Sequence, residues 1–579
     1  MRLLCSSVAR AFCSIFVVVA AISFSNAQDR SQVATAIGQP TLIVSISKIE
    51  QLKEHATYIL RAVNQPEISG LATTLVDLYT GGLDRSRPIG VAVSLNGEGN
   101  PTPVVMLPIS DLKTFFASLA NFGEPEELGN GLYTISVGPQ TVFAKQVNDW
   151  LIVAQQEGVA NEFKQVPSDL LQNLSSRYDV GIKLDVQSIP AQLRDKLLIQ
   201  MKEAFERANA QQVLRLEREL KEAEAQASTD EERAVIAGRR AGIQVSQQIQ
   251  KTQIEEIEDM IRNTKQVVIG LLGDSPNKQV YLEVASEFIA GSKLDAQIAR
   301  SATAQTDFSA LPMDGQTIAL SFSEVLDPSQ IPQIEQTVNA AFDTAIKNVP
   351  KSGNSQAAVE FIKEIKLLVI KGIQDGNVDG AASVTFQSGL NIVTASRVAD
   401  GKQLAASLEK VSAAMSQAPD APKIKFNAYS HQSSSVHIGT LKLPSDADEK
   451  ARKIFSDTIH FAIATSDKKV VLALGSQAEA NLKAALDRIA GKPATQGSPV
   501  AMSIEVGPLL DYLQSVDPSP IVEAMIQGAQ NYADKDMLTI KSQLVPHGAV
   551  IRISIEEGVL RAIGAGAKAG QGNSRGGRF

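Results

Sequence analysis

The sequence predicts an α+β fold made of two tandem duplicated halves, each with a mainly antiparallel sheet packed by helices. Short segments that alternate apolar and polar residues are separated by turn residues, a pattern typical of antiparallel hairpins. Helical segments lie between the hairpins, and we expect them on one face of each sheet. Strand-like segments of the first half also recur in the second half, as TLIVSIS at 41–47 does in TIALSFS at 317–323.

The duplication is predicted from segments that match in the same order along the chain. The matching pairs are 41–47 with 317–323, 111–119 with 400–408, 150–154 with 470–474, 180–186 with 500–506, and 280–284 with 550–554. The separation between partners grows and then shrinks, so the first half carries a segment that the second half lacks. The alternative is that two unrelated α+β units have a similar order of strands and helices.

These matches define the expected domains. The segments are 1–27 as a signal peptide, 28–312 as the first repeat with a helical insertion at about 190–265, 313–565 as the second repeat, and 566–579 as a disordered tail. The tail is expected to be disordered because it is rich in glycine and has few apolar residues to pack.

The N-terminus has the three-part pattern of a secretory signal. Arg2 and Arg10 precede an apolar run, and small residues stand before the expected cleavage site between Ala27 and Gln28. We therefore expect an exported protein, periplasmic or extracellular. No later apolar run is long enough to span a bilayer, so we expect no transmembrane segment in the mature chain.

Cysteine content and charge exclude several classes of function. Cys5 and Cys13 both lie in the predicted signal, so the mature chain has no disulfide and no thiol nucleophile. The formal net charge is −8, and aromatic residues make up 5% of the chain. No basic stripe is present, which disfavours nucleic-acid binding.

The segment 190–265 predicts two long antiparallel helices that meet along a narrow apolar seam. The seam residues proposed for this pair, and for contact with a partner, are Leu193, Leu197, Phe205, Leu216, Ile243 and Ile257. Two interpretations remain open. The helices are either solvated and lie on their own domain, or they form an arm that binds a protein partner.

No catalytic, metal-binding or cofactor motif is recognised in the sequence. Two Ser-x-x-Lys patterns, at 275–278 and 466–469, fall in expected hairpin turns instead of opening a helix as a nucleophilic serine does. His431 and His437 flank a serine-rich turn, but no third ligand lies nearby in the sequence. We therefore expect no cofactor and no metal, and leave open whether the chain is an enzyme.

Several short segments carry a resemblance to a known group of proteins. They are 87–91 (RPIGV), 107–113 (LPISDLK), Asp149-Trp150, the charged helix after Ile189-Pro190, and 555–560 (IEEGVL). With them, the order of elements resembles that of uncharacterised secreted proteins of planctomycete bacteria. The resemblance implies export and a similar architecture, and it implies no activity.

Three functions follow as hypotheses. The first is a non-enzymatic extracytoplasmic binding or scaffold protein of unknown ligand. The second is a carrier of lipid or another hydrophobic ligand, with curved sheets forming an apolar groove. The third is an enzyme whose site is assembled from scattered Asp, Glu and Lys side chains, and a deep pocket with converging titratable groups would favour it.

Overall fold

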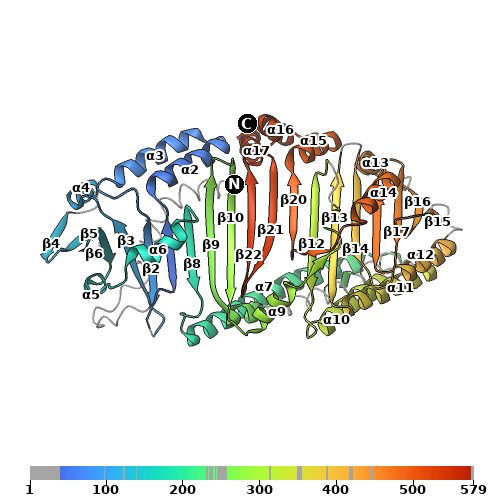
Figure 1. Cartoon of the computed structure of the whole chain (residues 1–579), viewed down its shortest axis with the longest axis horizontal. Coiled ribbons are helices and arrows are strands. Elements are labelled where there is room, and N and C mark those ends of the chain that lie inside the picture. The colour runs from blue at the N-terminus through green and yellow to red at the C-terminus, as the bar shows by residue number, and fades with distance from the viewer. Residues whose placement is uncertain are drawn as a thin grey trace.

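The computed structural model describes residues 39–575 apart from 97, 121–123, 138–139, 230–232, 234–235, 237–238, 241–242, 244–256, 312–314, 348–354, 387–388, 416–421 and 444–446. The described chain is an elongated antiparallel sheet with helices along both long edges and on its faces (Figure 1). The predicted α+β class is confirmed. The expected cleavage site, Ala27-Gln28, lies outside the described residues.

Within the described residues the main sheet contains twenty strands, and all of their pairings are antiparallel. Those of the first half are β1 (Leu42–Ile46), β2 (Ile89–Leu95), β3 (Pro101–Pro108), β4 (Pro125–Gly129), β5 (Leu132–Val137), β6 (Gln140–Val147), β7 (Trp150–Ala154), β8 (Val180–Asp185), β9 (Thr264–Asp274) and β10 (Gln279–Phe288). Those of the second half are β12 (Ile318–Val325), β13 (Asn377–Thr385), β14 (Asn391–Arg397), β15 (Lys423–His431), β16 (Ser434–Lys442), β17 (Thr458–Thr465), β18 (Lys469–Leu474), β20 (Ala501–Glu505), β21 (Met537–Val545) and β22 (Gly548–Glu556). A separate pair joins β11 (Gln305–Thr306) to β19 (Thr495–Gln496).

The helices connect these strands. In the first half they are α2 (Ile49–Ala62), α3 (Pro66–Tyr79), α4 (Leu112–Ser118), α5 (Glu157–Asn161), α6 (Pro167–Ser175), α7 (Ala191–Gln226) and α9 (Lys293–Ser301). In the second half they are α10 (Ile331–Lys347), α11 (Ser355–Gln374), α12 (Gly401–Met415), α13 (Glu449–Phe455), α14 (Ala478–Ile489), α15 (Val506–Val516), α16 (Pro520–Ala529), the short η1 (Gln530–Tyr532) and α17 (Glu557–Arg575).

The strand order reads alike from both ends of the sheet. The pairings give the order β4-β5-β6-β7-β3-β2-β1-β8-β9-β10 in the first half, and β15-β16-β17-β18-β14-β13-β12-β20-β21-β22 from the other end. The halves meet where β10 pairs with β22, in the middle of the molecule (Figure 1). Glu283 and Arg552 lie opposite each other at the centre of this pair.

Helices pack on both faces of the sheet, which corrects the expectation of one covered face. Face A is the face that carries Leu151, and face B is the face that carries Ile152. Leu151 packs in one cluster with Phe115 of α4, and Ile152 packs in another with Leu171 of α6. Strand β7 is apolar on both sides because it is buried on both sides.

The segment expected to be a disordered tail instead continues α17 as far as Arg575. The glycines of α17 allow close packing between helices. A Cβ at Gly564 would lie 2.3 Å from the Val63 carbonyl oxygen at the end of α2, and one at Gly566 would lie 2.6 Å from Cγ of Met525 in α16. The proposed domain boundary at residue 565 therefore divides one helix. The glycines in this helix permit close packing. The low apolar content of the segment 566–579 therefore did not indicate the helical structure of residues 566–575.

The helical insertion also has different limits from those expected. Strand β9 begins at Thr264, which is buried, so the last residues of the segment 190–265 belong to the sheet. The second half has α15 and α16 at the corresponding place, between β20 and β21. The first half therefore has a longer connection there, not an additional one. Among the described helices, none combines the length and apolarity needed to cross a membrane.

Candidate functional site

Face A of the central sheet is a continuous apolar surface. Directly opposed residues on neighbouring antiparallel strands share a face. The middle row of face A, from β9 to β12, consists of Leu271, Leu282, Ile553, Ile540, Met502 and Leu320. A second row beside it contains Ile269, Val284 and Ile551. We call these nine residues the central apolar face.

The central apolar face is incompletely covered by the protein. Ile269 and Leu271 on β9 are each 40% exposed, Leu282 on β10 is 38% exposed, and Ile551 on β22 is 45% exposed. Scattered exposed apolar residues are ordinary on a protein surface, but contiguous ones mark a place where another molecule binds. These side chains are neighbours on three adjacent strands, so they form such a contiguous patch.

The opposite face of the same strands is polar. On β10, β22 and β21 the side chains of face B include Glu283, Arg552 and Lys541, which are aligned in one row. On face A the same three strands carry only apolar residues and the serines Ser286 and Ser542. The period of two therefore separates a polar face from a face suited to hydrophobic contacts.

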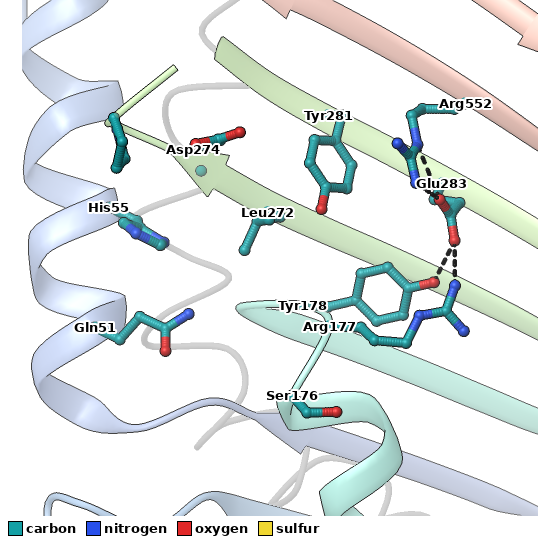
Figure 2. Close-up of a pocket in the computed structure, with 12 residues that line it drawn as sticks. Gln51, His55, Ser176, Arg177, Tyr178, Leu272, Asp274, Tyr281, Glu283 and Arg552 are labelled. Atoms are coloured by element: carbon teal, nitrogen blue, oxygen red, sulfur yellow. Dashed lines mark hydrogen bonds and ion pairs between the residues drawn. The ribbon is translucent and has the colours of Figure 1, made fainter. Parts of the chain in front are cut away.

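A polar pocket of about 400 Å³ lies on the other side of the sheet, at the β9–β10 turn. It is formed by α2, the loop between α6 and β8, the facing ends of β9 and β10, and one side chain of β22 (Figure 2). Glycines bring the loop close to the sheet. A Cβ at Gly270 would lie 2.2 Å from the ring of Tyr178, so this ring packs directly on β9.

Glu283 is the most buried charged group of the pocket, with 1% of its side chain exposed. Its Oε1 accepts hydrogen bonds from Arg177 at 2.6 Å and from the Tyr178 hydroxyl at 2.5 Å. Its Oε2 accepts two from Arg552, at 3.0 and 2.5 Å. Burial acts to raise the pKa of Glu283, but these hydrogen bonds and the two positive charges outweigh it and lower the pKa.

His55 is held by a buried carboxylate beside the same pocket. Its Nδ1 lies 2.8 Å from both carboxylate oxygens of Asp179. Asp179 also accepts hydrogen bonds from the Gly273 backbone N–H at 2.7 Å and from Gln51 at 3.2 Å. A carboxylate at Nδ1 fixes the orientation of the imidazole and leaves Nε2 for another partner.

The two carboxyl groups that line the pocket suit binding better than general acid catalysis. The pKa of Asp274 is lowered like that of Glu283, because hydrogen bonds from Asn277 and Gln279 outweigh the effect of burial. A general acid needs a pKa near the working pH, and neither lining carboxyl group meets that requirement. The titratable groups do converge, as the enzyme hypothesis requires, but the two lining carboxylates already have partners.

The predicted helical pair is observed as far as its described residues extend. Arg262 pairs with Asp195 near the base, and Arg240 pairs with Glu224 farther along, so the second arm returns antiparallel to α7. Residues 244–256 lie outside the described part of the chain. Leu193 contacts Gly99, on the loop between β2 and β3.

The apolar seam differs in part from the predicted one. Among the residues of the hairpin that the structure describes, the most buried apolar ones are Leu198, Leu220 and Ile236. Leu197 is 43% exposed and Leu216 is also exposed, whereas Phe205, Ile243 and Ile257 are half-buried. The prediction placed Leu197 on the seam, but the helix turns Leu198 inward, and this one-residue shift rotates the stripe by about 100°.

The other residues singled out in the sequence have structural roles. Both Ser-x-x-Lys patterns lie in the hairpin turns β9–β10 and β17–β18, and Trp150 is buried in the core. His431 pairs with Asp487, whereas His437 is buried and accepts a hydrogen bond from the Asn427 N–H. In the part of the chain that the structure describes, no group of three or more His, Cys, Asp or Glu side chains could hold a metal.

Sequence reasoning missed both candidate sites. Alternation in β10 and β22 indicated a face with Leu282 and Ile551, but nothing local shows that such a face stays uncovered. Glu283 and Arg552 are far apart in the chain, and only the pairing of β10 with β22 brings them together. No family model, curated protein or solved structure matches the chain.

Proposed function

We propose that the chain is an exported binding protein that holds an elongated hydrophobic ligand against the central apolar face. The observation that supports this function is the contiguous exposure of Ile269, Leu271, Leu282 and Ile551 on adjacent strands. Burial of such surface stabilises a complex by roughly 25 cal/mol per Å² of apolar area removed from water. A lipid acyl chain is the ligand class that matches a face without charges.

The dimensions of the face agree with this ligand. Strands lie about 4.8 Å apart, so the six strands from β9 to β12 span roughly 24 Å. One leaflet of a bilayer contributes half of a hydrocarbon core of roughly 30 Å, so an acyl chain extends about 15 Å. The middle row of the central apolar face can therefore accommodate a whole chain laid across the strands.

The proposal has a direct test in paired double variants. Leu282→Gln with Ile551→Gln changes the central apolar face, and Ala285→Gln with Val550→Gln changes the opposed pair on face B of the same two strands. Full burial of a Leu or Ile side chain contributes about 1.5–3 kcal/mol, and each of these two is about 40% exposed. Losing both contributions predicts a roughly tenfold to hundredfold weaker Kd.

The measurement is titration with a fluorescent fatty acid, together with mass spectrometry of lipids extracted from the natively purified protein. We expect bound lipid and the predicted weakening in the face A variant alone. Equal affinity of the two variants for the fatty acid would contradict the proposal. A dimer of the unmodified protein that the face A variant dissociates would show instead that this face binds a second copy.

A second candidate function rests on the helical hairpin. On α7, Leu197 and Met201 are exposed on one side, and Leu214 is 61% exposed farther along. Exposed apolar residues on a long charged helix favour an arm that binds a protein partner. A deletion variant, described in the Discussion, distinguishes this arm from a helix that is only solvated.

We also infer that the two halves arose by duplication of one unit. The matched strand order supports this inference, and so does the register across the sheet. Ser45 on β1 and Ser321 on β12 stand in one face B row, at equal numbers of strands from the Glu283–Arg552 pair. Export remains a proposal that depends on the signal pattern before Gln28.

A further inference from the structure

The polar pocket at the β9–β10 turn has donors at one end and acceptors at the other. It opens on face B, so it is separate from the central apolar face and independent of the proposed function. Figure 2 shows Arg177 and Arg552 at one end, Asp274 and His55 at the other, and the Tyr281 side chain between them.

The donor end retains positive charge after its internal pairing. Two guanidinium groups, of Arg177 and Arg552, share the single carboxylate of Glu283. Their side chains are 57% and 52% exposed, and each guanidinium has five N–H donors, of which Glu283 takes one from Arg177 and two from Arg552. The remaining donors suit a carboxylate, which guanidinium groups bind with paired hydrogen bonds.

The acceptor end has the opposite character. His55 donates from Nδ1 to Asp179, so the neutral form of the imidazole presents an acceptor at Nε2. Gln51 donates its amide N–H to Asp179, which leaves its Oε1 as an acceptor. The carboxylate of Asp274 lines the same end. These groups suit an ammonium group, which has donors and no acceptor.

We propose that this pocket binds a small zwitterion, with its carboxylate at Arg177 and Arg552 and its ammonium group at Asp274 and His55. A ligand with only a negative charge would gain nothing from Asp274, whose hydrogen-bond donors Asn277 and Gln279 are uncharged. A ligand with only a positive charge would lie beside two guanidinium groups. A zwitterion of the amino-acid class complements both ends at once. A ligand with a single charge would place like charges together at one end, and this repulsion weakens its binding.

Calorimetric titration with a graded set of probes tests the proposal. The zwitterions are glycine, 4-aminobutyrate and 6-aminohexanoate, which differ in the separation of their charges, and the single-charge analogues are hexanoate and hexylamine. We expect saturable binding of at least one zwitterion and at least tenfold weaker binding of both analogues. Equal binding of hexanoate that Arg177→Gln weakens would show a simple anion site, and equal binding of hexylamine that Asp274→Asn weakens would show a cation site; either result would overturn the proposal.

Two variants assign the ends. Arg177→Gln should weaken the affinity for the zwitterion at least tenfold. Asp274→Asn should weaken it to the same extent without increasing the affinity for hexylamine. Arg87→Gln is the control, because Arg87 is an exposed arginine that pairs with Asp84 and Asp149 away from the pocket. Circular dichroism and cooperative unfolding establish that each variant is folded. If no probe binds the unmodified protein, the charged lining is only structural and the proposal is wrong.

Discussion

Glu283→Gln should destabilise the protein because it removes one charge from the centre of the sheet and leaves two guanidinium groups facing each other. The replacement keeps the size of the side chain. Removing one partner of a fully buried ion pair costs about 3–5 kcal/mol. Here the carboxylate is buried but Arg177 and Arg552 are about half exposed, so water compensates part of the loss. We therefore expect a loss of about 2–3 kcal/mol.

Urea denaturation at pH 7.5 and at lower pH measures this difference. The pKa of Glu283 is lowered in the folded protein from an ordinary value of 4.5. Its contribution to the free energy of unfolding is therefore fully present above pH 4.5 and is lost as the pH falls through the folded-state pKa. The gap between the unmodified protein and the variant should close in that acidic range.

Glu287→Gln is the matched control, since Glu287 lies on the same strand and face and pairs near the surface with Lys265. We expect a much smaller loss of stability for this variant. Equal losses in the two variants would refute the argument from burial. A gap between Glu283→Gln and the unmodified protein that stays constant with pH would refute the argument from charge.

Three further predictions concern packing, the hairpin and export. Gly270→Ala should lower the free energy of unfolding by about 1–3 kcal/mol in urea denaturation, because its Cβ would meet the Tyr178 ring. Gly70→Ala should raise the free energy of unfolding by about 0.5–1 kcal/mol, because Gly70 lies in a helix with open space around it. Similar changes in the two variants would contradict this reasoning. Replacing 196–260 with a short Gly/Ser loop should leave cooperative unfolding intact, and unchanged capture of every partner would show that the hairpin is no binding arm. N-terminal sequencing of the exported protein should begin at Gln28, and a retained Met1 would exclude cleavage.

The fold class could be predicted because the strand patterns and the helix signals in the sequence both indicated an α+β fold. Alternation indicated the strands, and Asp111 caps α4 at the start of one of the matched segments by accepting hydrogen bonds from the backbone of Lys113 and Thr114. The matches of β1 with β12 and of β8 with β20 also keep equivalent residues on the same face. These strands alternate, so a shift by one residue would have been visible in the sequence.

Two other matches are out of register by one residue. Val280 lies on face A, whereas its proposed counterpart Val550 lies on face B. Alternation could have shown this, because the apolar residues of β22 on face A are Ile551 and Ile553. In β7 and β18 alternation could not help, since continuous apolar runs fit either register. The pocket was not predictable, because it depends on contacts between residues far apart in the chain.

The pairing of β10 with β22 determines when the sheet can be completed. Strand β22 lies far beyond β10 along the chain, so β10 stays an open edge with unpaired N–H and C=O groups until β22 has been synthesised. Such a long-range pairing makes folding slow and exposes the intermediate to aggregation. The outer edges are protected differently: β4 carries Pro125 and two glutamates, and β15 carries two lysines. A chain truncated before β22 should therefore self-associate through the unprotected edge of β10.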